Sequence, residues 1–201
     1  VRPSDTKESL LKKVRLATIL GTFQSTLVNF KYVSSSWKKN CEEERLLGVS
    51  LTGIMDCQYT NGKKNGLEDL LEELKAEAVK TNKEFAQKIG INQSVAVTCV
   101  KPSGTVSQLV DAASGIHARH NPYYIRTVRG DKKDPLTRMM QDAGIPVEDD
   151  GMNPSNTSVF SFPMKVDNSA VFRTEKSDID KLELWLTYKN HWDTHKPSFT
   201  I

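Results

Sequence analysis

The apolar residues of this chain recur at two spacings in turn, which predict helices alternating with short strands. The spacing of a helix with one buried face, three or four residues, occurs in four stretches, at 4–30, 67–89, 135–144 and 177–192. Short apolar runs bounded by turn-forming residues predict strands at 46–51, 95–100, 123–128 and 155–165. Strands that alternate with helices along a chain pair in parallel, so the pattern predicts an α/β fold with a parallel sheet.

Local sequence signals predict where these elements begin and end, and which of their faces are buried. We expect the first helix to start from a Ser/Asp cap and to be long and well buried, on a face made of Leu10, Val14, Ala17 and Leu20. The second long helix is amphipathic and stops at Gly90, as a covering helix would. The run 38–45, KKNCEEER, fits a solvated helical turn. Residues 148–150 read as a surface loop, and Pro163 marks an end or an edge of the last strand.

Composition narrows the class of protein without naming a function. The chain has 201 residues, of which 37% are hydrophobic and 26% charged, as in a soluble globular protein. The net charge of +3 is too small to demand a nucleic-acid or membrane partner. No apolar stretch is long enough to cross a membrane, and the three unpatterned cysteines fit a reducing, cytoplasmic setting. No repeat or linker divides the chain, so we expect a single α/β unit over residues 1–201.

Both ends of the sequence predict that the chain is a fragment of a larger protein. It begins with Val1 instead of Met. It closes on residues 198–201, SFTI, which read as a strand that has only begun.

Residues 95–129 hold the most informative run of the chain, VAVTCVKPSGTVSQLVDAASGIHARHNPYYIRTVR. A β-branched strand ends at Lys101 and Pro102, and a loop of small and hydroxyl residues follows before the apolar pattern resumes at Leu109. A helix that starts there aims unpaired backbone N–H groups at the loop, which suits a phosphate. The loop is therefore a candidate anion site.

An ordinary helix cap explains the same residues without a ligand. On spacing alone this second interpretation is favoured, because the loop has neither the Walker nor the Rossmann glycine pattern. The predicted position of the loop favours the anion site, since ligands of parallel α/β sheets lie at the carboxyl ends of strands.

Other candidate chemistry near this run is weaker. His117 and His120 form a His-x-x-His pair without an acidic or thiol neighbour, which is more typical of polar support than of a metal site. A nucleotide- or RNA-binding module is the alternative function, with stacking and phosphate contacts from Tyr123, Tyr124, Arg126 and Arg129. The low net charge and a strand that we expect to face the core weigh against it.

Three runs together resemble the large catalytic chain of ribonucleotide reductases, and in particular the adenosylcobalamin-dependent class II that acts on ribonucleoside triphosphates. The runs are KKNCEEERLLGVSLTGIMD at 38–56, KPSGTVSQLVDAASGIHARHNPYYIRTVR at 101–129 and HKPSFTI at 195–201. The family holds the substrate phosphates in a Pro-Ser-x-Thr-x-Ser loop. The matching residues here, which the resemblance marks as the phosphate-binding loop, are Pro102, Ser103, Gly104, Thr105, Val106 and Ser107.

The resemblance implies a ten-stranded α/β barrel of which this chain is the second half. The family makes deoxyribonucleotides by a thiyl-radical mechanism, with a cysteine in an Asn-Pro-Cys finger loop that precedes the helix opening this chain. No Asn-Pro-Cys occurs here, and Cys41, Cys57 and Cys99 match none of the family's redox positions. The expected role of the chain is thus to supply the phosphate loop and no catalytic residue.

The same resemblance implies the partners of the larger enzyme. These are ribonucleoside triphosphates or diphosphates as substrate, adenosylcobalamin as cofactor, a thioredoxin-type reductant and the remaining half of the barrel, in the cytoplasm. Neither a membrane nor DNA is expected as a partner, and the fragment alone is expected to be inactive.

Overall fold

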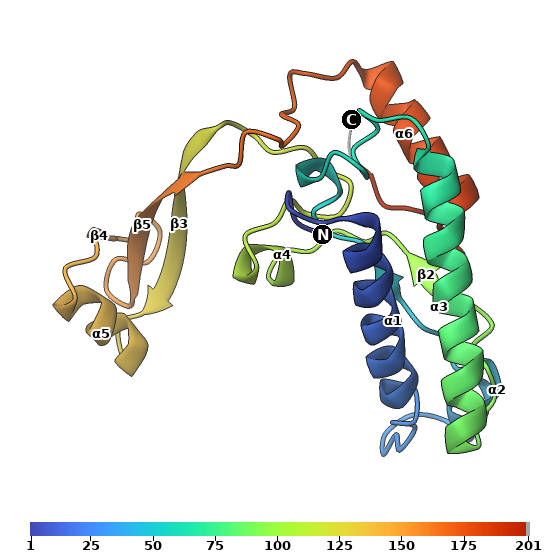
Figure 1. Cartoon of the computed structure of the whole chain (residues 1–201). Coiled ribbons are helices and arrows are strands. Elements are labelled where there is room, and N and C mark those ends of the chain that lie inside the picture. Colours follow the sequence, from blue (N-terminus) through green and yellow to red (C-terminus); the bar gives the residue numbers. More distant parts are fainter. Residues whose placement is uncertain (200–201) are drawn as a thin grey trace. The chain divides into compact units, whose positions relative to one another are not determined.

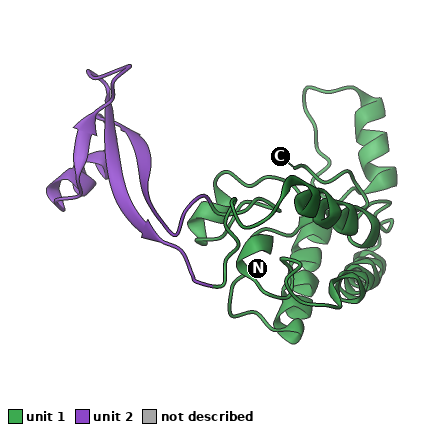
Figure 2. Cartoon of the chain, turned by 90° about the horizontal axis from the view of Figure 1, so that it is seen from above, with its two compact units in different colours: residues 1–119, 169–201 green, residues 120–168 purple. Residues whose placement is uncertain are grey.

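A computed structural model describes residues 1–199, which form two compact units (Figures 1 and 2). The first unit comprises residues 1–119 and the segment from 169 onward, and residues 120–168 form the second. The second unit is thus inserted between two segments of the first. The sequence shows no linker at either boundary. That residues 1–201 belong to one α/β domain of a larger barrel stays a prediction.

The helices predicted for the first unit are present, although the first ends at Gln24, where the prediction carried it to residue 30. They are α1 (Lys7–Gln24), α2 (Ser35–Glu44), α3 (Leu67–Ile89) and α6 (Asp178–His191), with the single turns η1 (Ile54–Asp56) and α4 (Val106–Leu109). Thr6 caps α1, two residues after the expected Ser4, and a reciprocal bond with Ser9 completes the capping box. Ser177 caps α6 in the same way, and Gly90 ends α3 in the left-handed conformation.

The sheet of the first unit is smaller than the sequence suggests. Strand β1 (Val49–Ser50) pairs in parallel with β2 (Thr98–Cys99), and these two strands make the whole sheet. A mixed α/β fold with a parallel pair is therefore confirmed for the described residues, whereas an extended parallel sheet is not formed there. Each strand is two residues long, so helices and loops supply most of the core.

The core of the first unit lies between α1, α3 and the strand pair. Its largest fully buried side chains include Trp192, Tyr188, Leu10, Ile54, Leu71 and Leu74. The buried face of α1 consists of Leu10, Val14, Thr18 and Thr22, and the expectation for Ala17 and Leu20 was wrong, since both are exposed. The two buried threonines satisfy their hydroxyl groups on backbone oxygens one turn earlier, at 2.8 Å each, which lets them lie in the core.

The second unit is an antiparallel sheet with one helix, and Figure 1 shows its two long strands side by side. The strand order is β3 (Tyr123–Asp131), β5 (Thr157–Lys165), β4 (Val147–Asp149), and α5 (Pro135–Asp142) follows β3 in the chain. Two expectations were wrong here. Residues 148 and 149 belong to β4 instead of a loop, and Tyr123 and Ile125 of β3 are 68% and 69% exposed instead of facing the core.

Pro163 lies where the sequence placed it, at a locally open side of its strand. It pairs with Ile125 of β3, while the pairing of β5 with β4 ends at Phe160. Because proline has no N–H to donate, this position on β5 costs the sheet no hydrogen bond.

The segment after α6 runs along β2. Trp192 Nε1 donates to the Cys99 oxygen at 2.9 Å, Thr194 N–H to the Thr98 oxygen at 3.0 Å, and Ser198 N–H to the Val100 oxygen at 3.2 Å. A strand was predicted at 198–201. Ser198 and Phe199 form no regular strand, and the last two residues of that prediction lie outside the described range.

Asp193 is buried in this segment, and neither carboxyl oxygen has a hydrogen-bond partner among the described residues. Burial raises the pKa of Asp193 to about 7, against the opposing attraction of Lys101 and Lys75. A carboxyl group whose pKa is higher in the folded state destabilises the fold as the pH rises from the unfolded value to the folded value.

We therefore predict that Asp193→Asn stabilises the chain at pH 8 and leaves its stability nearly unchanged at pH 4. The gain should grow between these pH values to at most ~4 kcal/mol, because each pKa unit corresponds to about 1.4 kcal/mol. Urea unfolding across this pH range, followed by circular dichroism, measures the difference. A gain that is the same at both pH values would show that the ionisation of Asp193 is not its cause.

Candidate functional site

The loop at residues 102–107 lies on the surface, where the chain leaves β2. Ser103 N–H donates to Ser114 Oγ at 2.8 Å, and Ser107 N–H donates to Ser103 Oγ at 2.9 Å. Ser107 Oγ also donates to the Ser103 backbone oxygen. Pro102 is exposed at the entry. The two serines thus close the loop on itself and fix its shape.

The tip of the loop carries the donors that could bind an anion. The backbone N–H groups of Gly104, Thr105 and Val106 make no hydrogen bond within the described part of the chain, and all three residues are exposed. The side chain of Thr105, at the N-cap of α4, caps no N–H group. Three neighbouring N–H groups and one hydroxyl are therefore available to a phosphate.

The structure changes the physical basis of the predicted anion site. Helix α4 is a single turn of four residues, so it contributes little macrodipole. The competing interpretation, an ordinary helix cap, holds in part, since Ser103 Oγ accepts the N–H of Ser107. This cap leaves the N–H groups of Gly104, Thr105 and Val106 at the loop tip unpaired.

A buried ion pair fixes the segment that supports the loop. Arg119 Nε and Nη2 donate to Asp56 Oδ1 and Oδ2, both at 3.0 Å, and the two residues are 9% and 1% exposed. Asp56 Oδ2 also accepts the Ala113 N–H at 2.7 Å. Arg119 Nη2 further donates to the Asp111 backbone oxygen at 2.9 Å. The guanidinium group of Arg119 thereby ties the end of the segment 111–119 to its beginning at Asp111.

Thr52 and Gly115 complete this support. Thr52 Oγ1 donates to the Ala113 oxygen at 3.0 Å and accepts the Gly115 N–H at 2.9 Å. Gly115 has φ +52°, and a Cβ there would lie 2.9 Å from the Lys101 oxygen, so glycine is required on both counts. Residue 114 is held between these contacts, which places its hydroxyl against Ser103.

The other candidates from the sequence lie elsewhere or are already engaged. His117 Nδ1 lies 3.0 Å from the Ser114 oxygen, and His120 belongs to the second unit. Among the described residues no three His, Cys, Asp or Glu side chains group as metal ligands. Cys57 and Cys99 are buried and Cys41 is half-buried.

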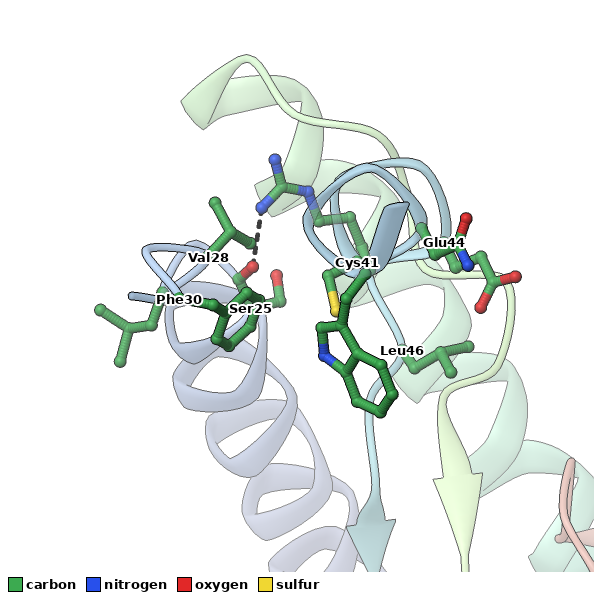
Figure 3. A pocket seen from close by; sticks show the side chains of 10 residues that line it. Ser25, Val28, Phe30, Cys41, Glu44 and Leu46 are labelled. Atoms are coloured by element: carbon green, nitrogen blue, oxygen red, sulfur yellow. Dashed lines mark hydrogen bonds between the residues drawn. The ribbon is translucent and has the colours of Figure 1, made fainter. Parts of the chain in front are cut away.

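Cys41 lies in the wall of a pocket of about 360 Å³ between the end of α1 and α2 (Figure 3). Most of the lining is apolar, with Leu27, Val28, Phe30, Trp37 and Leu46. Arg45 closes one side and donates to the Ser25 oxygen at 2.7 Å. No residue of the loop at 102–107 contributes to this lining.

The residues of the alternative RNA-binding hypothesis lie on β3 of the second unit. Tyr123 is exposed, as stacking requires, but Arg129 Nε donates to Asp150 Oδ1 at 2.7 Å. That bond and two backbone N–H groups that Asp150 also accepts hold the pKa of this carboxyl below its usual range. Binding of single strands by β3 stays a prediction.

The support of the loop was missed by sequence reasoning. Asp56 and Arg119 are 63 positions apart, and neither carries a local signal for pairing. The one available hint was Asp56, an acidic residue at the end of an otherwise apolar run, where burial would require a basic partner.

We predict that Arg119→Met destabilises the chain by ~3 to 5 kcal/mol, because it leaves the Asp56 carboxylate buried without its partner. Urea unfolding at pH 7 measures the loss. Asp111→Asn is the matched control: the Asp111 side chain is 59% exposed and its bond to Arg119 is 3.3 Å long, so its loss should cost less than about 1 kcal/mol. Asparagine also tolerates the φ of +47° at this position. Equal losses in the two variants would contradict the role of the buried pair.

Comparison with known proteins supplies relatives for this chain. No family model matches the sequence. The chain is 28% identical to the adenosylcobalamin-dependent ribonucleoside-triphosphate reductase of Euglena gracilis over 96% of its own length and 29% of that protein. It is 30% identical to the enzyme of the same description from Lactobacillus gasseri over 66% of its length and 21% of that protein.

A solved structure agrees with these relatives. The crystal structure of a B12-dependent (class II) ribonucleotide reductase superimposes on 96% of the chain with a TM-score of 0.78 and 22% identity, and the match covers 30% of that protein. The chain thus has the fold of one part of this structure, and it spans less than a third of each protein named. No described helix has the length and apolar character needed to cross a membrane.

Proposed function

Starting from the partial homology of this chain to adenosylcobalamin-dependent, class II ribonucleotide reductases, we propose that it is a part of such an enzyme and supplies its substrate phosphate-binding loop. The reaction of the whole enzyme would be the reduction of ribonucleoside triphosphates or diphosphates to deoxyribonucleotides. The observation that carries the proposal is the 28% identity over 96% of the chain.

In this proposal Pro102, Ser103, Gly104, Thr105, Val106 and Ser107 hold the phosphates. The free N–H groups at the loop tip would donate to phosphate oxygens, and Thr105 would add its hydroxyl. Each charge-assisted bond of this kind contributes ~1.5 to 3 kcal/mol before ordering costs. The closed shape of the loop supports the assignment, because donors held in place before binding lose little entropy on binding.

The thiol groups of this chain do not fit the radical chemistry of adenosylcobalamin. Cys57 and Cys99 are buried, and Cys41 lies on α2 in the wall of an apolar pocket that no residue of the loop lines. None therefore offers an accessible thiol beside the phosphate loop. We assign the cofactor, the thiyl cysteine and the contact with a thioredoxin-type reductant to other parts of the larger, cytoplasmic enzyme.

The exposed apolar side chains of the first unit support a missing neighbour within the same enzyme. Leu16, Leu20, Phe23 and Leu27 of α1 and its continuation are 51%, 70%, 48% and 73% exposed. Such a row is unusual on a free surface. The proposal is that the remaining half of a ten-stranded barrel covers it, with β1 and β2 as two of the barrel strands.

The test is Gly104→Asp in the reductase that contains these residues. Gly104 lacks a positive φ and a Cβ there would meet nothing within 4 Å, so the substitution fits the fold. A carboxylate at the loop tip would repel the phosphates, and the KM for the nucleotide should rise at least tenfold, about 1.4 kcal/mol. Steady-state kinetics measure the change.

Gly104→Asn is the matched control for this test, since it has the same size without the charge. It should raise the KM much less than the aspartate does. An aspartate variant with an unchanged KM would remove the phosphate site from the proposal.

A further inference from the structure

The loop that precedes α3 contains two Asn-Gly sequences, at residues 61–62 and 65–66, and no other asparagine of the chain is followed by glycine. Asparagine before glycine is prone to spontaneous deamidation, because glycine has no Cβ to hinder the attack of its backbone nitrogen on the asparagine side chain. The sequence marks both positions equally. The structure separates them, since they differ in exposure, in hydrogen bonding and in the space around them.

Asn61 is enclosed and held in place. The residue is 0% exposed, and its Oδ1 accepts the Lys63 N–H at 3.0 Å. Its Nδ2, the group that deamidation releases as ammonia, is buried as well. A Cβ at Gly62 would lie 3.2 Å from Leu184 Cδ1, so the space beside this pair of residues is already filled. A reaction at Asn61 therefore requires the loop to open first.

Asn65 and Gly66 have none of these restraints. Both residues are exposed, and the Gly66 N–H donates to no backbone oxygen within the described part of the chain. Gly66 is the N-cap of α3, so the hydrogen bonds of the helix do not use its nitrogen. A Cβ at Gly66 would meet nothing within 4 Å, which leaves room for a ring to form between the two residues.

We infer that Asn65 is a site of spontaneous deamidation and that the fold protects Asn61 from the same reaction. The Gly66 nitrogen loses its proton and bonds to Asn65 Cγ, the Cγ–Nδ2 bond breaks, and Nδ2 takes up a proton and leaves as ammonia. Water then opens the resulting succinimide at either carbonyl and gives aspartate or isoaspartate. The reaction needs water alone, and it is independent of the proposed phosphate loop.

Both products change the start of α3. A neutral amide becomes a carboxylate, so the net charge of +3 falls by one unit. The new charge lies next to the N-cap of a 23-residue helix, where Gly66 offers no side-chain cap and negative charge is favourable. Isoaspartate also lengthens the main chain by one atom at this point.

The isoaspartate form has a partner of defined chemistry. Its free carboxylate is the group that isoaspartyl methyltransferases methylate, with S-adenosylmethionine as the methyl donor. Residue 65 lies in an exposed loop, which such an enzyme can reach in the folded chain. The content of isoaspartate at this position should therefore increase with the age of each molecule.

Tryptic digestion after incubation of the folded chain at neutral pH tests the inference, because trypsin cleaves between the two sites, after Lys63 and Lys64. Mass spectrometry then follows each asparagine in its own peptide. We expect Asn65 to deamidate at least about tenfold faster than Asn61, a difference of about 1.4 kcal/mol in activation free energy. Methylation from labelled S-adenosylmethionine by an isoaspartyl methyltransferase should label the Asn65 peptide and not the Asn61 peptide.

Unfolding and substitution supply the controls. In urea the protection of Asn61 is lost, so the two sites should react at comparable rates. Asn65→Gln changes an exposed side chain and should abolish the fast reaction, because the larger ring that glutamine requires forms far more slowly. Equal rates in the folded chain, no reaction at Asn65, or a rate difference that persists in urea would overturn the inference.

Discussion

The buried ion pair between Arg119 and Asp56 is the interaction on which the support of the loop at residues 102–107 depends. Two charges inside a protein are tolerated only when good geometry and further hydrogen bonds compensate their desolvation. Here the carboxylate accepts two guanidinium bonds and one backbone N–H, and the guanidinium also holds a backbone oxygen. The pair joins the turn η1 to the segment behind the loop, so the shape of a surface loop is set from the core.

This support explains how an exposed loop can keep N–H groups unpaired without losing its shape. Serine side chains at positions 103 and 107 form bonds within the loop, and Ser114 ties it to the supported segment. These bonds on either side of the tip fix its conformation, although the N–H groups of the tip form no hydrogen bonds themselves among the described residues. In the proposed site it is therefore mainly the backbone N–H groups of the tip that bind the phosphate.

Local signals predicted the helices well and the sheet poorly. Caps and stops such as Ser177 and Gly90 lie within a few residues of the elements they bound, so they are visible in the sequence. The antiparallel strands of the second unit depend on pairing between β3 and β5, which no single run reveals. In the site, the loop was recognisable as a run of small residues, whereas Asp56 and Arg119 acquire their importance from each other, 63 positions apart in the chain.

The segments of the first unit that lead into and out of residues 120–168 pair with each other in one short parallel bridge, between Arg119 and Phe172. Arg119 N–H donates to the Val171 oxygen and Arg173 N–H donates to the Arg119 oxygen, both at 3.0 Å. The chain therefore leaves and re-enters the first unit at neighbouring points. An insertion attached in this way can be lengthened, shortened or replaced by a tight turn while the fold that carries it stays intact, so the length of the 120–168 segment is not constrained by the path of the chain in the first unit.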